Sequence, residues 1–238
     1  MAGKKRLLFL ASLFFICKIY GQDKPINVYF FPGTGSDERL FSKIILPVGF
    51  EAKHIAYHVP ERRVELGKYA ISLLPQIDTT QPFVLVGVSV GGMICTELAD
   101  LTNPHKTIII SSAKCRSELP WQYRFQKYLP INKLFGARLV KGMSFVAQAV
   151  VEPDSRHEKQ VFDAMLRSRN AKYIKRTVNM IVNWERKSYS PNIIHIHGTK
   201  DHTLPLKNIK PTIIVKDGSH MMTLTKGEEI SALIVENL

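Results

Sequence analysis

Three residues of the kinds that nucleophilic catalysis needs lie at separate points of the chain. Ser89 stands in Gly87-Val88-Ser89-Val90-Gly91-Gly92, Asp201 in Gly198-Thr199-Lys200-Asp201, and His220 in Asp217-Gly218-Ser219-His220. A serine hydroxyl is a weak nucleophile until a base takes its proton, and the base is oriented by an acid. We therefore predict Ser89 as a nucleophile, His220 as its general base and Asp201 as the acid that orients His220.

The surroundings of Ser89 strengthen this prediction. The pattern G-x-S-x-G is the nucleophile elbow, in which a serine occupies a sharp turn between a strand and a helix. An apolar run, Phe83 to Val88, precedes Ser89, and a helical pattern, Gly91 to Leu101, follows it. The alternative is a tight turn with a structural serine.

Other acids and histidines compete for the same roles. Asp217 lies close to His220 in the sequence, where a shared turn is the more natural role, and Glu118 is a more distant rival to Asp201. His195 and His197 alternate along one predicted strand, which favours core or supporting positions over metal binding. We expect a structural role for His202.

Backbone N–H groups near Ser89 could stabilise a developing oxyanion. The residue after the nucleophile, Val90, should supply one, and Thr34 in the glycine-rich loop Pro32 to Asp37 the other. A dinucleotide-binding loop needs a third glycine where Glu38 stands, and no Gly-Lys-Ser/Thr follows as a P-loop requires. The sequence therefore predicts no cofactor and no metal.

Short apolar runs alternate with helical patterns, which predicts an α/β fold with a compact, mostly parallel sheet of about six strands and flanking helices. The runs are dense in Val, Ile and Phe, as expected for strands that are covered on both faces. The predicted strands are 26–31, 52–57, 83–88, 107–111, 193–197 and 212–215, and the predicted helices among them are 37–45, 64–74, 91–101 and 228–236.

The alternation of predicted strands and helices stops at about residues 113–191, where the pattern is helical throughout. Ser155-Arg156-His157-Glu158 predicts a capping box, and apolar stripes follow at 161–166 and 174–182. We expect this segment to be an inserted helical cap, or lid, over the sheet. Its large side chains should form an acyl pocket or the cap's own core: Trp121, Tyr123, Phe125, Phe135, Met143, Phe145 and Trp184.

The positive charge of the chain is concentrated in that segment. The formal charge is +13 overall, and residues 113–191 hold sixteen Lys or Arg against six Asp or Glu. Such a segment is a candidate for contact with an anionic membrane or an acidic substrate, or it is a solvated surface. No nucleic-acid-binding module is recognisable. The oligomeric state, and whether Cys95 and Cys115 pair, stay open.

The N-terminus has the pattern of an export signal. Lys4, Lys5 and Arg6 precede an apolar run from Leu7 to Cys17, which is too short to span a bilayer as a helix. We predict a signal peptide at 1–21, a mature domain at 22–238, and a periplasmic, secreted or envelope-associated protein. An uncleaved or lipid anchor and a cytosolic protein are the alternatives.

Four blocks of the chain, Phe30–Phe41, Gly87–Gly92, His197–Pro205 and Gly218–His220, resemble the α/β-hydrolase family, whose serine, acid and histidine follow one another in this order. The resemblance covers most of the chain from Ile26 onward apart from the cap. It implies the roles given above for Ser89, Asp201, His220, Thr34 and Val90. The chain departs from the family pattern in having Pro32-Gly33 where many members have His-Gly, and in lacking the first two strands of the full fold.

Together these features predict a serine hydrolase, esterase- or lipase-like, that cleaves small-molecule or lipid acyl esters through an acyl-enzyme on Ser89. An acyltransferase or thioesterase with the same triad is one alternative. A non-catalytic binding protein on a hydrolase fold is another.

Overall fold

The computed structural model describes residues 24–128, 135–151 and 154–238, with the side chains of 145–151 excepted. The predicted signal peptide at 1–21 lies outside the described residues. Within them, one parallel sheet of six strands has the order β2-β1-β3-β4-β5-β6. Its strands are β1 (Ile26–Phe31), β2 (Phe50–His54), β3 (Phe83–Val88), β4 (Lys106–Ile110), β5 (Ile193–Gly198) and β6 (Ile213–Val215). The predicted α/β fold class is confirmed.

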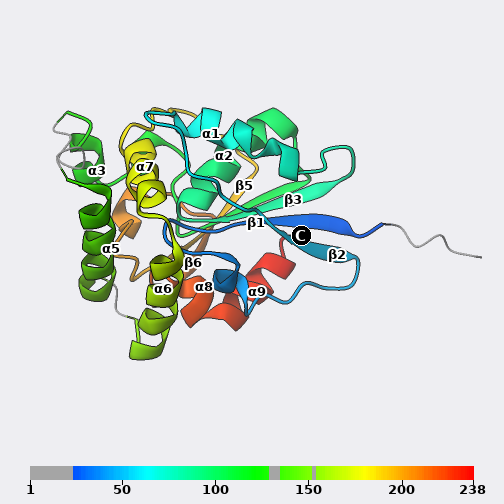
Figure 1. Cartoon of the computed structure of the whole chain (residues 1–238). Coiled ribbons are helices and arrows are strands. Elements are labelled where there is room, and N and C mark those ends of the chain that lie inside the picture. The colour runs from blue at the N-terminus through cyan, green and yellow to red at the C-terminus, as the bar shows by residue number, and fades with distance from the viewer. Residues whose placement is uncertain (1–23, 129–134, 152–153) are drawn as a thin grey trace, which may run out of the picture.

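Helices cover both faces of this sheet (Figure 1). One face packs on α1 and α2, and the other on η1, α8 and α9. Neighbouring residues of β1 serve opposite faces, because Phe30 packs with Leu40 while Phe31 packs with Leu66. The helices of these layers are η1 (Glu38–Phe41), α1 (Leu66–Ser72), η2 (Leu74–Gln76), α2 (Val90–Thr102), η4 (Leu206–Asn208), α8 (Met222–Thr225) and α9 (Gly227–Val235).

The chain between β4 and β5, here called the β4–β5 segment, is helical and lies at one end of the molecule, on the left in Figure 1. It contains η3 (Arg116–Glu118), α3 (Trp121–Phe125), α5 (Ala137–Val151), α6 (Arg156–Ser168) and α7 (Ala171–Val182). Apolar stripes position α6 and α7. Their side chains Phe162, Leu166 and Ile174 are buried in the same cluster as Phe30 and Leu40, on the face of the sheet that packs on η1. None of the described helices is long and apolar enough to cross a membrane.

Three local predictions were wrong in detail. The helix expected from residue 37 to 45 is a single 3₁₀ helix, Glu38–Phe41, which Asp37 caps and in which the amide of Ser42 donates to the carbonyl three residues earlier, that of Arg39. The second strand starts at Phe50 rather than at residue 52 and stops early, since the Gln76 side chain takes both backbone groups of Ala56. Ser155 does precede α6, but its side chain makes no cap hydrogen bond, so the capping box is absent.

Candidate active site

Ser89 occupies the turn between β3 and α2 in a backbone conformation that side chains rarely adopt, with φ 55° and ψ −121°. The neighbouring glycines are required by backbone contacts. A Cβ on Gly91 would lie 2.1 Å from the Phe31 carbonyl oxygen, and one on Gly87 would lie 2.4 Å from the Gly91 carbonyl oxygen. The turn is closed by the amides of Gly92 and Met93, which donate to the Ser89 carbonyl. The G-x-S-x-G spacing therefore follows from how tightly β1, β3 and α2 meet.

The side chains of Ser89, His220 and Asp201 form a continuous hydrogen-bonded chain. His220 Nε2 lies 3.0 Å from Ser89 Oγ, and His220 Nδ1 lies 2.9 Å from Asp201 Oδ2. The three residues follow β3, β6 and β5 respectively, so they meet at the carboxyl edge of the sheet. The arrangement has the geometry in which an imidazole can take a proton from a serine hydroxyl.

Asp201 is held by the loop that follows β5. The amide of Leu204 donates to Asp201 Oδ1 at 2.7 Å, and the loop closes on the turn before His220, where a Cβ on Gly198 would meet the Gly218 carbonyl oxygen at 2.1 Å. Burial on its own raises the pKa of Asp201. The His220 imidazole and the hydrogen bonds outweigh it, and the net pKa is lowered. Asp201 thus faces His220 as a carboxylate.

The rival acids lie elsewhere. Asp217 is exposed and pairs with Lys200 at 2.9 Å. Glu118 is buried, but it accepts hydrogen bonds from the amides of Lys114 and Lys210.

His197 supports the loop that carries Asp201. Its Nε2 donates to the Leu204 carbonyl at 2.8 Å and lies 3.5 Å from Asp201 Oδ2. Burial lowers the pKa of His197, and the Asp201 charge offsets this only in part. A neutral His197 therefore contacts both Asp201 and Leu204, the first and last residues of the turn that follows β5. The sequence placed His197 on a strand but gave no sign of this contact, because Leu204 offers only a backbone carbonyl.

The loop after β1 approaches Ser89 from the other side. A Cβ on Gly33 would lie 3.2 Å from Ser89 Cβ, and Gly35 has φ +83°. Thr34 and Ser89 line one cavity. Within the described part of the chain, no hydrogen bond is formed by the amide of Thr34 or of Val90. These amides are therefore available to a ligand oxygen beside Ser89.

The cavity beside Ser89 has a volume of about 470 Å³. Its apolar wall includes Leu40, Phe162, Val178, Ile181 and Met221. Polar side chains that also line it are Gln122, Tyr123, Gln126, His202 and Thr203. A volume of this size suits a small molecule.

The large side chains of the predicted cap differ in where they lie: some line the cavity, some are exposed and some are buried. Tyr123 lines the cavity, whereas Trp121, Phe125 and Met143 are exposed. Trp184 is buried and donates to Glu97, and Phe135 packs in the core. The side chain of Phe145 lies outside the described residues. The cavity wall is thus built mostly from aliphatic residues that the aromatic pattern did not single out.

Two contacts that tie the β4–β5 segment to this edge were also missed from the sequence. Arg169 donates from Nε to the Ser36 carbonyl at 2.9 Å, which holds the loop after β1. Ser219, next to His220, donates to Asp154. Each joins residues more than 60 positions apart, and no local pattern marks such a pair. Cys95 and Cys115 are buried and unpaired. In the described parts of the chain, no cluster of three or more His, Cys, Asp or Glu could hold a metal ion.

Solved structures with the same architecture identify the fold. An esterase from Exiguobacterium antarcticum superposes with a TM-score of 0.68 over 90% of this chain and 91% of the esterase, at 15% sequence identity. An enol-lactonase from Burkholderia xenovorans LB400 gives 0.69 over 90% and 91% at 14% identity. A thermophilic esterase from Thermogutta terrifontis gives 0.63 over 90% and 89% at 14% identity.

The chain has the α/β-hydrolase fold. The predicted resemblance is thereby confirmed at the level of fold. No protein-family model matches the sequence, and no curated protein is similar to it in sequence. Since identities of this size carry the fold alone, an activity has to be argued from the site of this α/β-hydrolase-fold protein itself.

Proposed function

We propose that this protein is a serine hydrolase that cleaves carboxylic esters through an acyl-enzyme on Ser89. The observation that carries the proposal is the hydrogen-bonded chain from Ser89 Oγ through His220 to Asp201, with contacts of 3.0 and 2.9 Å. The likeness in fold to esterases and an enol-lactonase supports the reaction class.

In the proposed mechanism, Ser89 Oγ attacks the acyl carbonyl carbon while His220 Nε2 takes the hydroxyl proton. Asp201 fixes the tautomer with hydrogen on Nδ1 and stabilises the imidazolium that forms. The tetrahedral oxyanion accepts hydrogen bonds from the amides of Thr34 and Val90, where the N-terminus of α2 also favours negative charge. His220 then protonates the leaving alcohol, and water attacks the acyl-enzyme by the reverse route.

The cavity supports an ester with an apolar acyl part. The aliphatic wall that includes Val178 and Ile181 would bury a hydrocarbon chain, and the polar side chains of Gln122 and Gln126 would face the alcohol side or solvent. We expect short and medium acyl chains to be preferred to long ones. Lactones belong in the substrate panel, since they are cyclic esters.

A fluorophosphonate probe tests the activated serine. We expect the wild type to be labelled, Ser89→Ala not to be labelled, and His220→Ala to be labelled at least about a thousandfold more slowly. Ser72→Ala, on α1 far from the cavity, is the matched control and should label like the wild type. Hydrolysis of p-nitrophenyl esters of increasing chain length then gives the acyl preference. A folded wild type that neither labels nor hydrolyses any ester would overturn the proposal.

We further propose that the protein is exported, with residues 1–21 removed as a signal peptide. The support is the basic and apolar pattern of that segment. N-terminal sequencing of the protein recovered from cells tests this proposal. A mature chain that begins near Gln22 is expected, and an intact N-terminus in the cytoplasmic fraction would contradict it.

A further inference from the structure

Large aromatic side chains stand exposed on one side of the segment from residue 121 to 128. Trp121 is 64% exposed, Phe125 51% and Tyr128 78%. The spacing of four residues places Trp121 and Phe125 on the same side of α3, where their rings lie 6.4 Å apart, and Tyr128 follows in the turn after this helix. Exposed apolar patches of this kind often mark a site of contact with a partner or a membrane.

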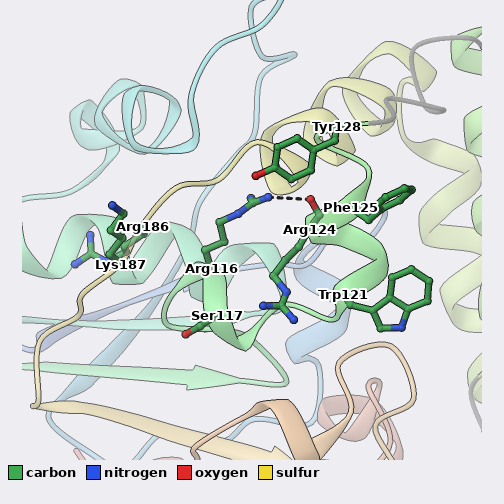
Figure 2. A pocket seen from close by; sticks show the side chains of 8 residues that line it. All are labelled: Arg116, Ser117, Trp121, Arg124, Phe125, Tyr128, Arg186 and Lys187. Carbon is green, nitrogen blue, oxygen red and sulfur yellow. Dashed lines mark hydrogen bonds between the residues drawn. The ribbon is translucent and has the colours of Figure 1, made fainter.

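Positive side chains adjoin these rings. A shallow open depression of about 610 Å³ is lined by the three aromatics together with Arg116, Arg124 and Lys187, and in Figure 2 the rings of Trp121 and Phe125 point away from Arg116. Arg116 is used internally, since it donates to the carbonyls of Val182 and Trp184.

Two of the positively charged side chains around the depression, Arg124 and Lys187, form no ion pair with a described residue. Arg186 is paired with Glu97 and Asp100, and Glu185 is paired with Lys127. Arg124 and Lys187 are both exposed. Arg124 comes from the same helix as Trp121 and Phe125, whereas Lys187 lies across the depression, on the other side of Arg116 (Figure 2).

We propose that this aromatic–basic surface, formed by Trp121, Arg124, Phe125, Tyr128 and Lys187, binds a membrane surface that contains anionic lipids. Trp and Tyr prefer the boundary between lipid and water, because one end of each ring system is apolar and the other is polar. Lys and Arg are drawn to anionic headgroups. The combination fits a bilayer surface better than a closed ligand site, since the depression is shallow.

Charge argues against a second copy of this chain as the occupant. Residues 113–191 carry sixteen Lys or Arg and six Asp or Glu, so two copies that met through this segment would repel one another. The same excess attracts an anionic bilayer over roughly a Debye length, about 8 Å at physiological salt.

The segment that carries the proposed membrane-binding surface also borders the cavity beside Ser89. Gln122, Tyr123 and Gln126 line the cavity beside Ser89, and they alternate along the chain with the exposed rings. One short segment therefore faces the cavity on one side and the proposed membrane surface on the other. The membrane proposal concerns binding and does not depend on ester hydrolysis.

Intrinsic fluorescence can test the proposal on the full chain. The protein has two tryptophans, and Trp184 is 3% exposed and bonded to Glu97, so a change in environment reports Trp121. Vesicles of phosphatidylcholine with phosphatidylglycerol should shift the emission to the blue, and lipids brominated on their chains should quench it. Pure phosphatidylcholine vesicles should have little effect, and high salt should reverse the shift. Trp121→Phe should remove the signal but keep vesicle co-sedimentation.

Paired variants separate the aromatic and the basic contributions. Arg124→Gln with Lys187→Gln should weaken co-sedimentation with anionic vesicles about 25-fold, at about fivefold per cation. Trp121→Ala with Phe125→Ala should weaken it roughly tenfold. Lys24→Gln with Lys106→Gln and Ile45→Ala with Val48→Ala are the matched controls. Their exposed or partly exposed side chains lie near the amino ends of the strands, and these variants should bind like the wild type.

Three results would overturn the proposal. One is vesicle binding that leaves Trp121 fluorescence unchanged, which would place the contact elsewhere, for example in residues 1–21. Another is equal binding to neutral and anionic vesicles. The third is a fluorescence shift with polyglutamate but no quenching by brominated lipid, which would make the surface a site for acidic polymers.

Discussion

Glycines at the carboxyl edge of the sheet are fixed by backbone contacts, whereas described glycines of the β4–β5 segment are not. A Cβ on Gly91 or Gly198 would lie 2.1 Å from a carbonyl oxygen, but one on Gly142 in α5 would meet nothing within 4 Å. The edge holds the side chains of Ser89, Asp201 and His220 through many backbone constraints. The segment is positioned by apolar stripes, which leave its outer face free to vary. A protein built this way can keep its chemistry while its substrate and surface contacts change.

The largest expected effect tests whether the edge depends on particular atoms. Asp201→Asn should lower kcat/KM for a p-nitrophenyl ester by about 10⁴-fold, because the amide favours the wrong tautomer of His220. Asp217→Asn removes the carboxylate that is nearer to His220 in the sequence. This variant should keep kcat/KM within about twofold of the wild type, since Asp217 is exposed and bound to Lys200. Steady-state kinetics on both folded variants measures the contrast. Equal losses would mean that the acid has been misassigned.

The glycine comparison itself can be measured as free energy of unfolding. Gly91→Ala should destabilise the protein by about 2–4 kcal/mol, because its methyl group would overlap the Phe31 carbonyl. Gly142→Ala should stabilise it by about 0.5–1 kcal/mol, because alanine loses less backbone entropy in an exposed helix. Urea unfolding followed by circular dichroism gives both values. A tolerated Gly91→Ala would show that α2 and β1 can move apart.

Arg169 is one of the residues that connect the two regions. Arg169, at the end of α6, holds the Ser36 carbonyl in the loop that carries Thr34. Arg169→Met should lower kcat about tenfold with a smaller change in KM, since the loop amides would lose their alignment with the oxyanion rather than a contact with the ground state. Lys172→Met, at an exposed position of α7, is the control. An unchanged kcat would show that the loop is positioned by the sheet edge alone.

The sequence was most informative where the backbone leaves little choice. β1 and β3 have the predicted bounds, because both are central strands, buried on both faces and read as continuous apolar runs. The order of Ser89, Asp201 and His220, each after a strand of a parallel sheet, predicted that they would share one edge. The structure brings their side chains within hydrogen-bonding distance.

The sequence was least informative where a side chain from far away decides the structure. The Gln76 side-chain amide ends β2, and the Leu204 carbonyl accepts a hydrogen bond from His197. The Ser155 capping box fails although its local pattern is complete, which shows that a motif fixes the start of a helix better than it fixes a hydrogen bond. Such contacts depend on tertiary packing, and that is decided by the whole chain.

The last prediction compares buried and exposed histidines in the two regions. Burial, the neighbouring His197 ring at 5.2 Å and the Lys114 ammonium lower the pKa of His195 well below its ordinary value. Since the unfolded chain titrates near pH 6.5, it binds a proton below that pH which the folded chain does not, and stability falls as the pH falls. The lowered pKa of Asp201 acts in the same direction only at more acidic pH.

The free energy of unfolding should therefore decline from pH 7.5 to pH 5, by at most about 1.4 kcal/mol per pH unit for each such histidine. His195→Gln should reduce this slope, whatever its effect on stability at pH 7.5. His157→Gln, at an exposed position of α6, should leave the slope as it is. Urea unfolding at a series of pH values supplies the slopes. If His157→Gln flattened the profile and His195→Gln did not, the β4–β5 segment and not the sheet would carry the acid sensitivity of the fold.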